Sequence, residues 1–280
     1  MAKETIAILG GRGMLGTDLV KTCQKRGFRV RVFDLPQFDI TNSEQLKEAV
    51  HSADAIINCA AYTNVDAAQS EADLAYQVNA AAVGRLGELA GKAGKWVLHV
   101  STDFVFDGQS DTLYAETDAP NPINEYGRTK LAGERLLAET GCDHCIIRVQ
   151  WTYGAAGDNF PKKLIARAKS GQNLKVVDDQ IGSPTATTEV ANAICDLLGK
   201  KPAGLFHFAA DGYVSRYEAA KFMFDMLCLD VSLLPCKTSD FAGPARRPLS
   251  SRFDCTKIKA VLNEPIKPWQ DPLEDFLRRL

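Results

Sequence analysis

The strongest constraint on the fold is a short apolar run that passes directly into a glycine-rich turn. Residues 5–9 (TIAIL) have the length and β-branched content of a buried strand, and the next residues read GGRGMLG. Glycines allow a tight turn and close approach of a ligand, and the free N–H groups that open the following helix attract negative charge. This order predicts a dinucleotide site; the alternative is a tight turn without a ligand. The candidate cofactor-binding residues are Gly10, Gly13, Met14, Leu15 and Gly16.

Strand-like and helix-like segments alternate as far as about Val149. Such alternation is typical of a doubly wound parallel sheet with helices on both faces. Beyond residue 150 the pattern loosens into shorter elements and polar loops. We therefore expect an α/β protein with a Rossmann-like dinucleotide-binding domain over residues 1–149. Residues 150–280 should form mainly a smaller substrate-binding lobe, with some segments returning to the first domain.

The adenosine end of the cofactor should meet the second predicted strand, residues 28–33. That strand ends at Asp34, 18 positions after Gly16. A carboxylate there can accept hydrogen bonds from the adenosine ribose, which favours NAD. Arg12 or Arg31 could instead bind the 2′-phosphate of NADP, so NADPH or NADH is expected.

Two further segments are candidates for cofactor contact. Asp39 and Ile40 could lie beside the adenine, although Thr41 and Glu44 also match a capping box that would simply open a helix through Val50. A later strand runs into a loop of small residues, against which a cofactor could lie. Its candidates are Ala60, Ala61 and Thr63.

Two polar clusters carry the candidate chemistry. Thr102 and Asp103 follow the apolar run of residues 96–100, so they should lie at the C-terminal edge of the sheet, where ligands bind. Tyr126 and Lys130 stand at i and i+4, so they share one face of the next predicted helix. An ammonium beside a phenol should lower the phenol pKa from about 10 and suit it to acid–base work. The alternative is an exposed pair on an ordinary amphipathic helix.

Composition argues against several classes of partner. The chain has 33 Lys and Arg against 35 Asp and Glu, so neither nucleic acid nor a membrane is expected to bind. No apolar run approaches 18 residues and the first residues lack a signal-peptide core, so a cytoplasmic protein is expected. Cys142 and Cys145 match C-x-x-C, a redox or half-zinc pattern, but no second pair follows at metal-ligand spacing. We expect reduced cysteines, partly buried histidines with local partners, and no metal site.

Together these features resemble the extended short-chain dehydrogenase/reductase superfamily. Six segments, which extend over nearly the whole chain, are similar in order and spacing to one branch, the dTDP-4-dehydrorhamnose reductase family. They are CAAYTNVDAAQSE (59–71), STDFVFDG (101–108), PNPINEYGRTKLAGE (120–134), GDNF (157–160), VVDDQIGSPTAT (176–187) and ARRPLSSRFDCTKI (245–258). A generic member of the superfamily would share only the glycines and the Tyr-Lys pair.

The resemblance implies NAD(P)H-dependent reduction of the C4 ketone of dTDP-6-deoxy-L-lyxo-4-hexulose to dTDP-L-rhamnose. It makes Tyr126 the acid that protonates the alkoxide and Thr102 a second donor to the same oxygen. Lys130 would hold the nicotinamide ribose and lower the tyrosine pKa. The implied contacts to the dTDP-sugar come from Thr102, Asp103, Phe104, Val105, Trp151, Arg246 and Arg247. The two arginines could instead be surface charge or an interlobe salt bridge.

Three positions depart from the family pattern. Phe104 stands where tyrosine is usual, Gln150 replaces a hydroxyl, and Arg216 replaces a tryptophan. Related nucleotide-sugar 4,6-dehydratases carry Asp-Glu after the threonine; because a phenyl ring cannot abstract a proton, Phe104 favours reduction. Two alternatives stay open: reduction or epimerisation of another nucleotide sugar, and a non-catalytic NADP-binding regulatory subunit like that of methionine adenosyltransferase. A homodimer is also expected.

Overall fold

The protein is built on a parallel β-sheet. The computed structural model describes residues 4–171, 173–241 and 243–280; residues 1–3, part of the stretch expected to lack a signal peptide, lie outside this range. Within the described residues six parallel strands pair in the order β10-β5-β4-β3-β1-β2. They are β1 (Thr5–Leu9), β2 (Arg29–Phe33), β3 (Ala55–Asn58), β4 (Trp96–Thr102), β5 (His144–Val149) and β10 (Gly204–Phe208). The predicted doubly wound α/β class is confirmed.

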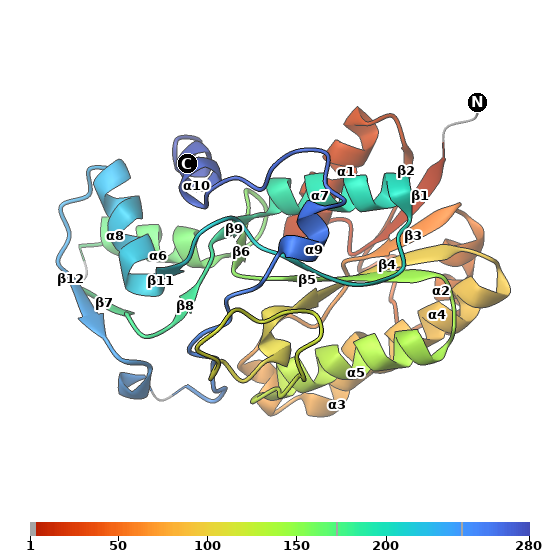
Figure 1. Ribbon diagram of the computed structural model, residues 1–280, viewed down its shortest axis with the longest axis horizontal. Coiled ribbons are helices and arrows are strands. Elements are labelled where there is room, and N and C mark those ends of the chain that lie inside the picture. Colours follow the sequence, from red (N-terminus) through yellow and green to blue (C-terminus); the bar gives the residue numbers. More distant parts are fainter. Residues whose placement is uncertain (1–3, 172, 242) are drawn as a thin grey trace.

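Helices cover both faces of this sheet (Figure 1). One face carries α1 (Met14–Lys25), α7 (Thr187–Lys200) and the short α9 (Thr256–Lys259). The other carries α2 (Ser43–His51), α3 (Ala72–Tyr76), α4 (Ala82–Lys92) and α5 (Glu125–Glu139). Each layer buries its apolar stripe against the sheet, as expected for strands that are apolar on both sides.

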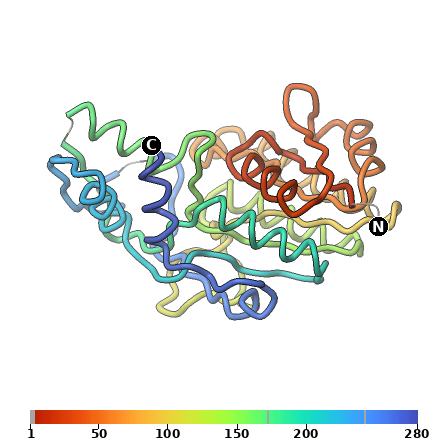
Figure 2. The backbone as a smooth tube through the Cα atoms, turned by 90° about the horizontal axis from the view of Figure 1, so that it is seen from above, coloured from red at the N-terminus to blue at the C-terminus, as the bar shows by residue number. Residues whose placement is uncertain are grey.

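A smaller lobe has its own apolar core. It contains α6 (Phe160–Lys169), β7 (Leu174–Val177), α8 (Arg216–Met226), β12 (Leu233–Cys236) and α10 (Gln270–Leu277). Short pairs connect it to the sheet: β6 (Thr152–Tyr153) with β9 (Thr185–Ala186), and β8 (Ile181–Gly182) with β11 (Val214–Ser215). The chain passes between lobe and sheet more than once, since α7 and β10 lie in the Rossmann layer; Figure 2 shows α10 (dark blue) beside the lobe.

The start of α2 differs from the sequence-based expectation. The helix is capped by Asn42, whose side-chain oxygen accepts from Glu44 N at 3.1 Å and Gln45 N at 3.2 Å. Thr41 instead donates its hydroxyl to Asp39. The predicted capping box at Thr41 and Glu44 is therefore wrong, because asparagine caps a helix as well as threonine does and lies one residue closer to the first turn.

The long helix expected after residue 72 is divided. A π-helical turn, η2 (Gln77–Ala81), separates α3 from α4 and places the buried Asn79 beside the loop that follows β3. Asn79 accepts from Tyr62 N at 2.8 Å and donates to Tyr62 O and to Thr129 Oγ1, both at 3.1 Å. One amide therefore ties that loop to α5.

A buried ion pair joins α5 to the sheet. Arg148 on β5 donates to both carboxylate oxygens of Glu134, at 2.9 and 2.6 Å, and both side chains are almost completely buried. Ser101 on β4 donates to the same carboxylate, and Arg148 also faces His207 on β10 at 3.3 Å. Four neighbouring elements of the fold therefore meet at this pair.

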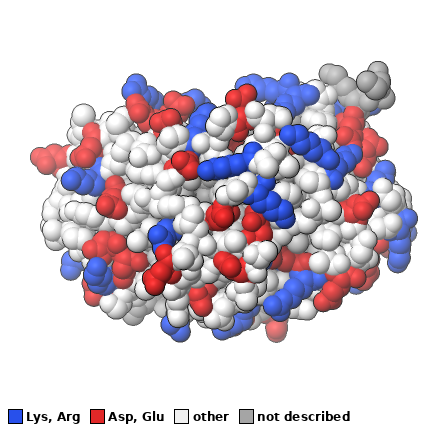
Figure 3. All heavy atoms as spheres, viewed as in Figure 1, with Lys and Arg blue, Asp and Glu red and all other residues white. Residues whose placement is uncertain are grey.

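On the surface seen in Figure 3, Lys and Arg are interspersed with Asp and Glu among the described residues. None of the helices in residues 4–171, 173–241 and 243–280 combines the length and the apolar character needed to cross a membrane.

We predict that Glu134→Ala lowers the free energy of unfolding by about 3–5 kcal/mol, because it leaves the Arg148 charge buried without its partner. Urea denaturation followed by circular dichroism measures this. The control is Glu274→Ala, which removes an exposed i,i+4 pair with Arg278 and should cost less than about 1 kcal/mol. Equal losses in the two variants would contradict the role given to the buried pair.

Candidate active site

The glycine turn lies at the point where the strand order reverses, between β1 and β3. Gly10 has a φ of +74°, and a Cβ there would lie 2.7 Å from Ala60 N. A Cβ on Gly16 would lie 2.6 Å from Gly11 Cα. Gly13 opens α1 without a side-chain cap, so the first N–H groups of the helix face outward. This cradle fits a dinucleotide pyrophosphate, and Met14 and Leu15, whose contact with the cofactor stays a prediction, are the first residues of α1.

The adenosine end of the cradle is shaped by Asp34, at the end of β2. Its carboxylate accepts from Arg12 N at 2.7 Å and from Leu35 N at 2.8 Å, and the Arg12 guanidinium donates to Gln37 at 2.8 Å. An acid and an arginine thus lie together. A ribose hydroxyl and a 2′-phosphate each find a complementary group here.

Asp39 and Ile40, the two residues predicted to contact the adenine, differ in exposure to solvent. Ile40 is buried in the core, whereas Asp39 is exposed and accepts from Thr41. Ala60 and Ala61 are partly exposed directly after β3, and Thr63 is exposed at the end of the same loop. A cofactor could touch the side chains of Asp39 and of this loop, whereas Ile40, whose side chain packs in the core, could meet it only through its backbone.

Thr102 and Asp103 lie at the C-terminal end of β4, as predicted, and both are buried. Thr102 Oγ1 donates to Asp103 Oδ1 at 3.1 Å and accepts from Phe104 N at 3.2 Å. Asp103 Oδ2 is buried and has no hydrogen-bond partner among the described residues. Burial raises the pKa of Asp103, although the hydroxyls of Ser251 and Thr102 act in the opposite direction. This carboxyl is therefore suited to receive a sugar hydroxyl.

Tyr126 lies in the first turn of α5, beside this cluster. Asn124 caps the helix by accepting from Gly127 N at 2.8 Å, and a Cβ on Gly127 would overlap the Phe104 carbonyl oxygen. The ring of Phe104 meets the Tyr126 ring edge to face, with centroids 5.6 Å apart. Val105 is fully buried in a separate apolar cluster. The start of α5 and the end of β4 are therefore packed as one unit.

The expected effect of Lys130 on the tyrosine is wrong for this structure. Burial raises the pKa of Tyr126 to about 12, and the Thr102 hydroxyl opposes this shift. Burial lowers the pKa of Lys130 to about 8. Lys130 donates to Val100 O at 2.8 Å and lies 3.2 Å from His99 Nε2, so its nitrogen is turned toward β4. Tyr126 thus keeps its proton at neutral pH, as an acid must.

His99 is the residue of the site that the sequence did not single out. It was expected to be partly buried with local partners, but it is fully buried and faces Lys130, 31 positions away. The one available signal was its place in the strand that ends at Thr102, two residues before Ser101.

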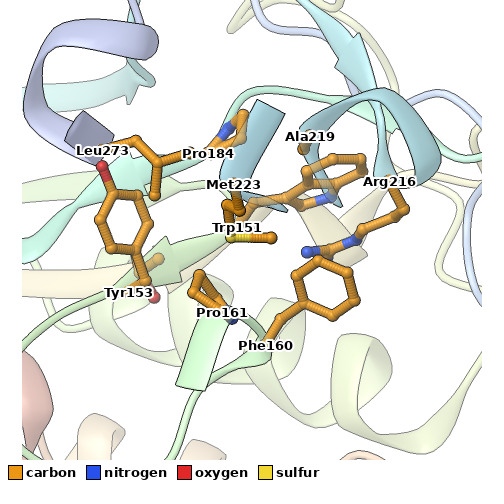
Figure 4. A pocket seen from close by; sticks show the side chains of 10 residues that line it. Trp151, Tyr153, Phe160, Pro161, Pro184, Arg216, Ala219, Met223 and Leu273 are labelled. Atoms are coloured by element: carbon orange, nitrogen blue, oxygen red, sulfur yellow. The ribbon is translucent and has the colours of Figure 1, made fainter. Parts of the chain in front are cut away.

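Trp151 follows β5 with a positive φ of 44°. The Arg216 guanidinium lies 3.6 Å from the centre of its ring and 4.8 Å from that of Phe160, so it stands between the two aromatic side chains (Figure 4). Burial lowers the pKa of Arg216 to about 9, and the Asp103 charge opposes this shift. The departure from tryptophan at position 216 therefore puts a cation on the wall that Trp151 forms.

The other predicted substrate residues and departures are placed as follows. Arg247 pairs with Asp66 at 2.8 Å, and Arg246 is exposed while its carbonyl accepts from Asn124 at 2.8 Å. Gln150 is fully buried: it donates to Ser251 and accepts from Ser183 N at 2.8 Å. The Gln150 amide therefore joins the loop of Ser251 to the loop of Ser183 and does not face an open site.

The whole described chain matches one family model. The model for the RmlD substrate binding domain covers residues 4–280. The dTDP-4-dehydrorhamnose reductase of Escherichia coli K12 is 35% identical over 98% of this chain and 97% of its own length. The chain belongs to the dTDP-4-dehydrorhamnose reductase (RmlD) family. Another member, the probable low-salt glycan biosynthesis reductase Agl14 of Haloferax volcanii, is 33% identical over 98% of this chain and 96% of its own length.

Solved structures of the RmlD family have the same fold. The dTDP-4-dehydrorhamnose reductase of Bacillus anthracis, in complex with NADP, aligns with a TM-score of 0.95 at 34% identity over all of both chains. The reductase of Clostridium acetobutylicum aligns with a TM-score of 0.94 at 33% identity over 98% of this chain and 99% of its own.

We predict that Gly16→Ala weakens NADPH binding about tenfold or more, because the added methyl group forces the turn apart. Quenching of NADPH fluorescence on titration measures the loss. Gly199→Ala is the matched control: a Cβ at this position of α7 meets no atom within 4 Å, so binding should be unchanged. Unweakened binding by a folded Gly16→Ala protein would contradict the cradle.

Proposed function

We propose that this member of the RmlD family reduces the C4 ketone of dTDP-6-deoxy-L-lyxo-4-hexulose to dTDP-L-rhamnose, using NADPH or NADH. The observation that carries the proposal is the approach of Tyr126 to the end of β4, where the Thr102 hydroxyl acts on the phenol and the Phe104 ring packs against it. Family membership over residues 4–280 supports the same reaction.

The coenzyme supplies the hydride, and the residues of the chain manage the charge that appears on the ketone oxygen. Tyr126 gives its phenolic proton to that oxygen, and its raised pKa keeps the proton in place until the alkoxide forms. Thr102 Oγ1 donates to the same oxygen once it turns from Asp103. Two donors on one developing alkoxide stabilise the transition state more than the ground state.

Asp103 and Arg216 are proposed to recognise the sugar through hydrogen bonds. The unpaired Oδ2 of Asp103 accepts from a ring hydroxyl, and Arg216 offers a positively charged donor where the family pattern has the neutral indole N–H of tryptophan. Because a buried polar group discriminates strongly against a substrate that cannot pair with it, this wall also favours one alternative, the reduction of a related nucleotide sugar. Phe104 still argues against dehydration.

The same proposal covers the assembly, the location and the partners of the protein. We propose a homodimer in the cytoplasm that binds a dTDP-sugar and neither nucleic acid nor membrane. Light scattering coupled to size exclusion measures the mass of the particle against the 30.5 kDa chain.

We predict that Tyr126→Phe lowers kcat roughly 10²–10⁴-fold while coenzyme binding is kept, because the variant loses only the proton donor. The measurement is NADPH and NADH oxidation at 340 nm with the product of a 4,6-dehydratase and a 3,5-epimerase acting on dTDP-glucose. Tyr76→Phe, at an exposed position of α3, is the control and should keep full activity.

The same experiment separates the alternatives. Turnover by the unmodified protein with a different nucleotide sugar alone would move the assignment to that sugar. Tight coenzyme binding without turnover of any sugar would favour the non-catalytic regulatory role, and copurification with a synthetase would support it.

A further inference from the structure

Three buried side chains form a continuous polar chain behind the candidate active site. Asn58 ends β3, His99 lies on β4 and Lys130 on α5, and all three are nearly inaccessible to solvent. Asn58 Nδ2 lies 3.1 Å from His99 Nδ1, and His99 Nε2 lies 3.2 Å from Lys130 Nζ. The proposed reaction gives no role to Asn58 or His99.

The orientation of the Asn58 amide is fixed by a backbone group. Ala60 N donates to Asn58 Oδ1 at 3.0 Å. A backbone N–H can only donate, so the atom that faces it is the carbonyl oxygen of the amide. The NH₂ group of Asn58 therefore points at His99 Nδ1, and an amide NH₂ can only donate as well.

This arrangement determines which nitrogen of His99 carries the proton. Nδ1 must supply a lone pair to Asn58, so in the neutral ring the proton is on Nε2. Burial, the largest cause, holds the pKa of His99 well below its usual range, so the ring is neutral. The Nε2–H bond then points toward Lys130 Nζ.

If Lys130 were protonated, its ammonium and the His99 Nε2–H group would face each other as two hydrogen-bond donors without an acceptor between them. An ammonium has no lone pair, whereas a neutral amine accepts from His99 and still donates to Val100 O at 2.8 Å. The groups around Nζ do not reverse this preference. Glu134, on the same helix, uses both oxygens on Arg148, and burial raises the pKa of Cys59 to about 12, so that thiol is neutral.

We propose that Asn58 and His99 are positioning residues that fix the proton on His99 Nε2 and thereby make Lys130 release its proton more readily in the coenzyme-free protein. The second half of this inference rests on the proposed function, in which Lys130 meets the nicotinamide ribose. Ribose oxygens accept hydrogen bonds and the pyrophosphate is negative, so both favour the ammonium. Above pH 8, where the amine of the free protein is largely neutral, coenzyme binding then brings a proton from solvent onto the lone pair of Nζ.

The titratable groups that face the chain come from every neighbouring element. They are Cys59 after β3, His144 on β5 and Glu134 on α5. Burial is the largest cause of the lowered pKa of Lys130, and Glu134 and Cys59 oppose it. Proton binding at Lys130 and coenzyme binding are linked, because the proposal makes the pKa of Lys130 lower in the free protein than in the complex. Coenzyme affinity therefore falls as the pH rises above about 8.

The direct test is nitrogen NMR of the coenzyme-free protein labelled at histidine, from pH 6 to 9. The His99 signals, assigned by their loss in His99→Gln, should show a protonated Nε2 and an unprotonated Nδ1 throughout. His144→Gln is the control, since it alters a neighbouring ring outside the chain. A protonated Nδ1, or an imidazolium, would overturn the proposal whether or not the protein reduces a sugar.

The second test replaces the Asn58 NH₂ group, which donates to His99 Nδ1, with a carboxylate oxygen, which accepts from it. In Asn58→Asp a carboxylate still accepts from Ala60 N but draws the His99 proton to Nδ1, which leaves Nε2 free to accept from an ammonium. NADPH affinity at pH 9 should fall about tenfold relative to pH 7 in the unmodified protein and less than about twofold in Asn58→Asp. An equal fall in both proteins would contradict the proposal. Lack of turnover with unchanged binding would count against the proposed reaction only.

Discussion

The active site depends on the buried ion pair between Glu134 and Arg148. Tyr126, Lys130 and Glu134 follow each other at four-residue intervals, so they line one face of α5 above the sheet. The carboxylate at the far end of this face is held by β5 through Arg148 and by β4 through Ser101. The height of the helix over the sheet, and with it the position of the phenol, is therefore set by a contact that no substrate reaches. Buried pairs of this kind contribute position more than net stability.

The coenzyme side of the site depends on a second constraint, which is the lack of room between β1 and β3. Gly10 and Gly16 leave space where any side chain would meet backbone atoms. Asn79, in the π-helical turn, holds the opposite loop by two hydrogen bonds to Tyr62 and ties it to α5 by a third, to Thr129. Both walls of the cradle are thus rigid, and a flat, charged ligand can lie against backbone alone.

The sequence predicted those parts of the structure that depend on local pattern. The strands, the parallel sheet, the glycine cradle, the position of Thr102 and Asp103 at a strand end, and the placement of Tyr126 and Lys130 on one helix all follow from periodicity and spacing. What it missed depends on contacts between distant segments. His99 faces Lys130 of α5 from β4, Gln150 turns inward to Ser251, and Arg216 of α8 stacks on Trp151. The pKa of Tyr126 was predicted in the wrong direction because the phenol is buried and the Lys130 nitrogen is turned toward β4, and a spacing reveals neither.

The path of the chain between the two lobes has a consequence for how specificity can be transferred. β10 pairs with β5 along its whole length and α7 packs on α1, yet Trp151 and Arg216, which form the aromatic and cationic wall, lie on either side of them in sequence. A single crossover near residue 150 would therefore exchange part of the sheet together with the pocket. Recombination between relatives can swap substrates while keeping the coenzyme only if two separate segments are exchanged. One segment contains α6 and precedes α7, the other contains α8 and follows β10, and α7 and β10 themselves are kept.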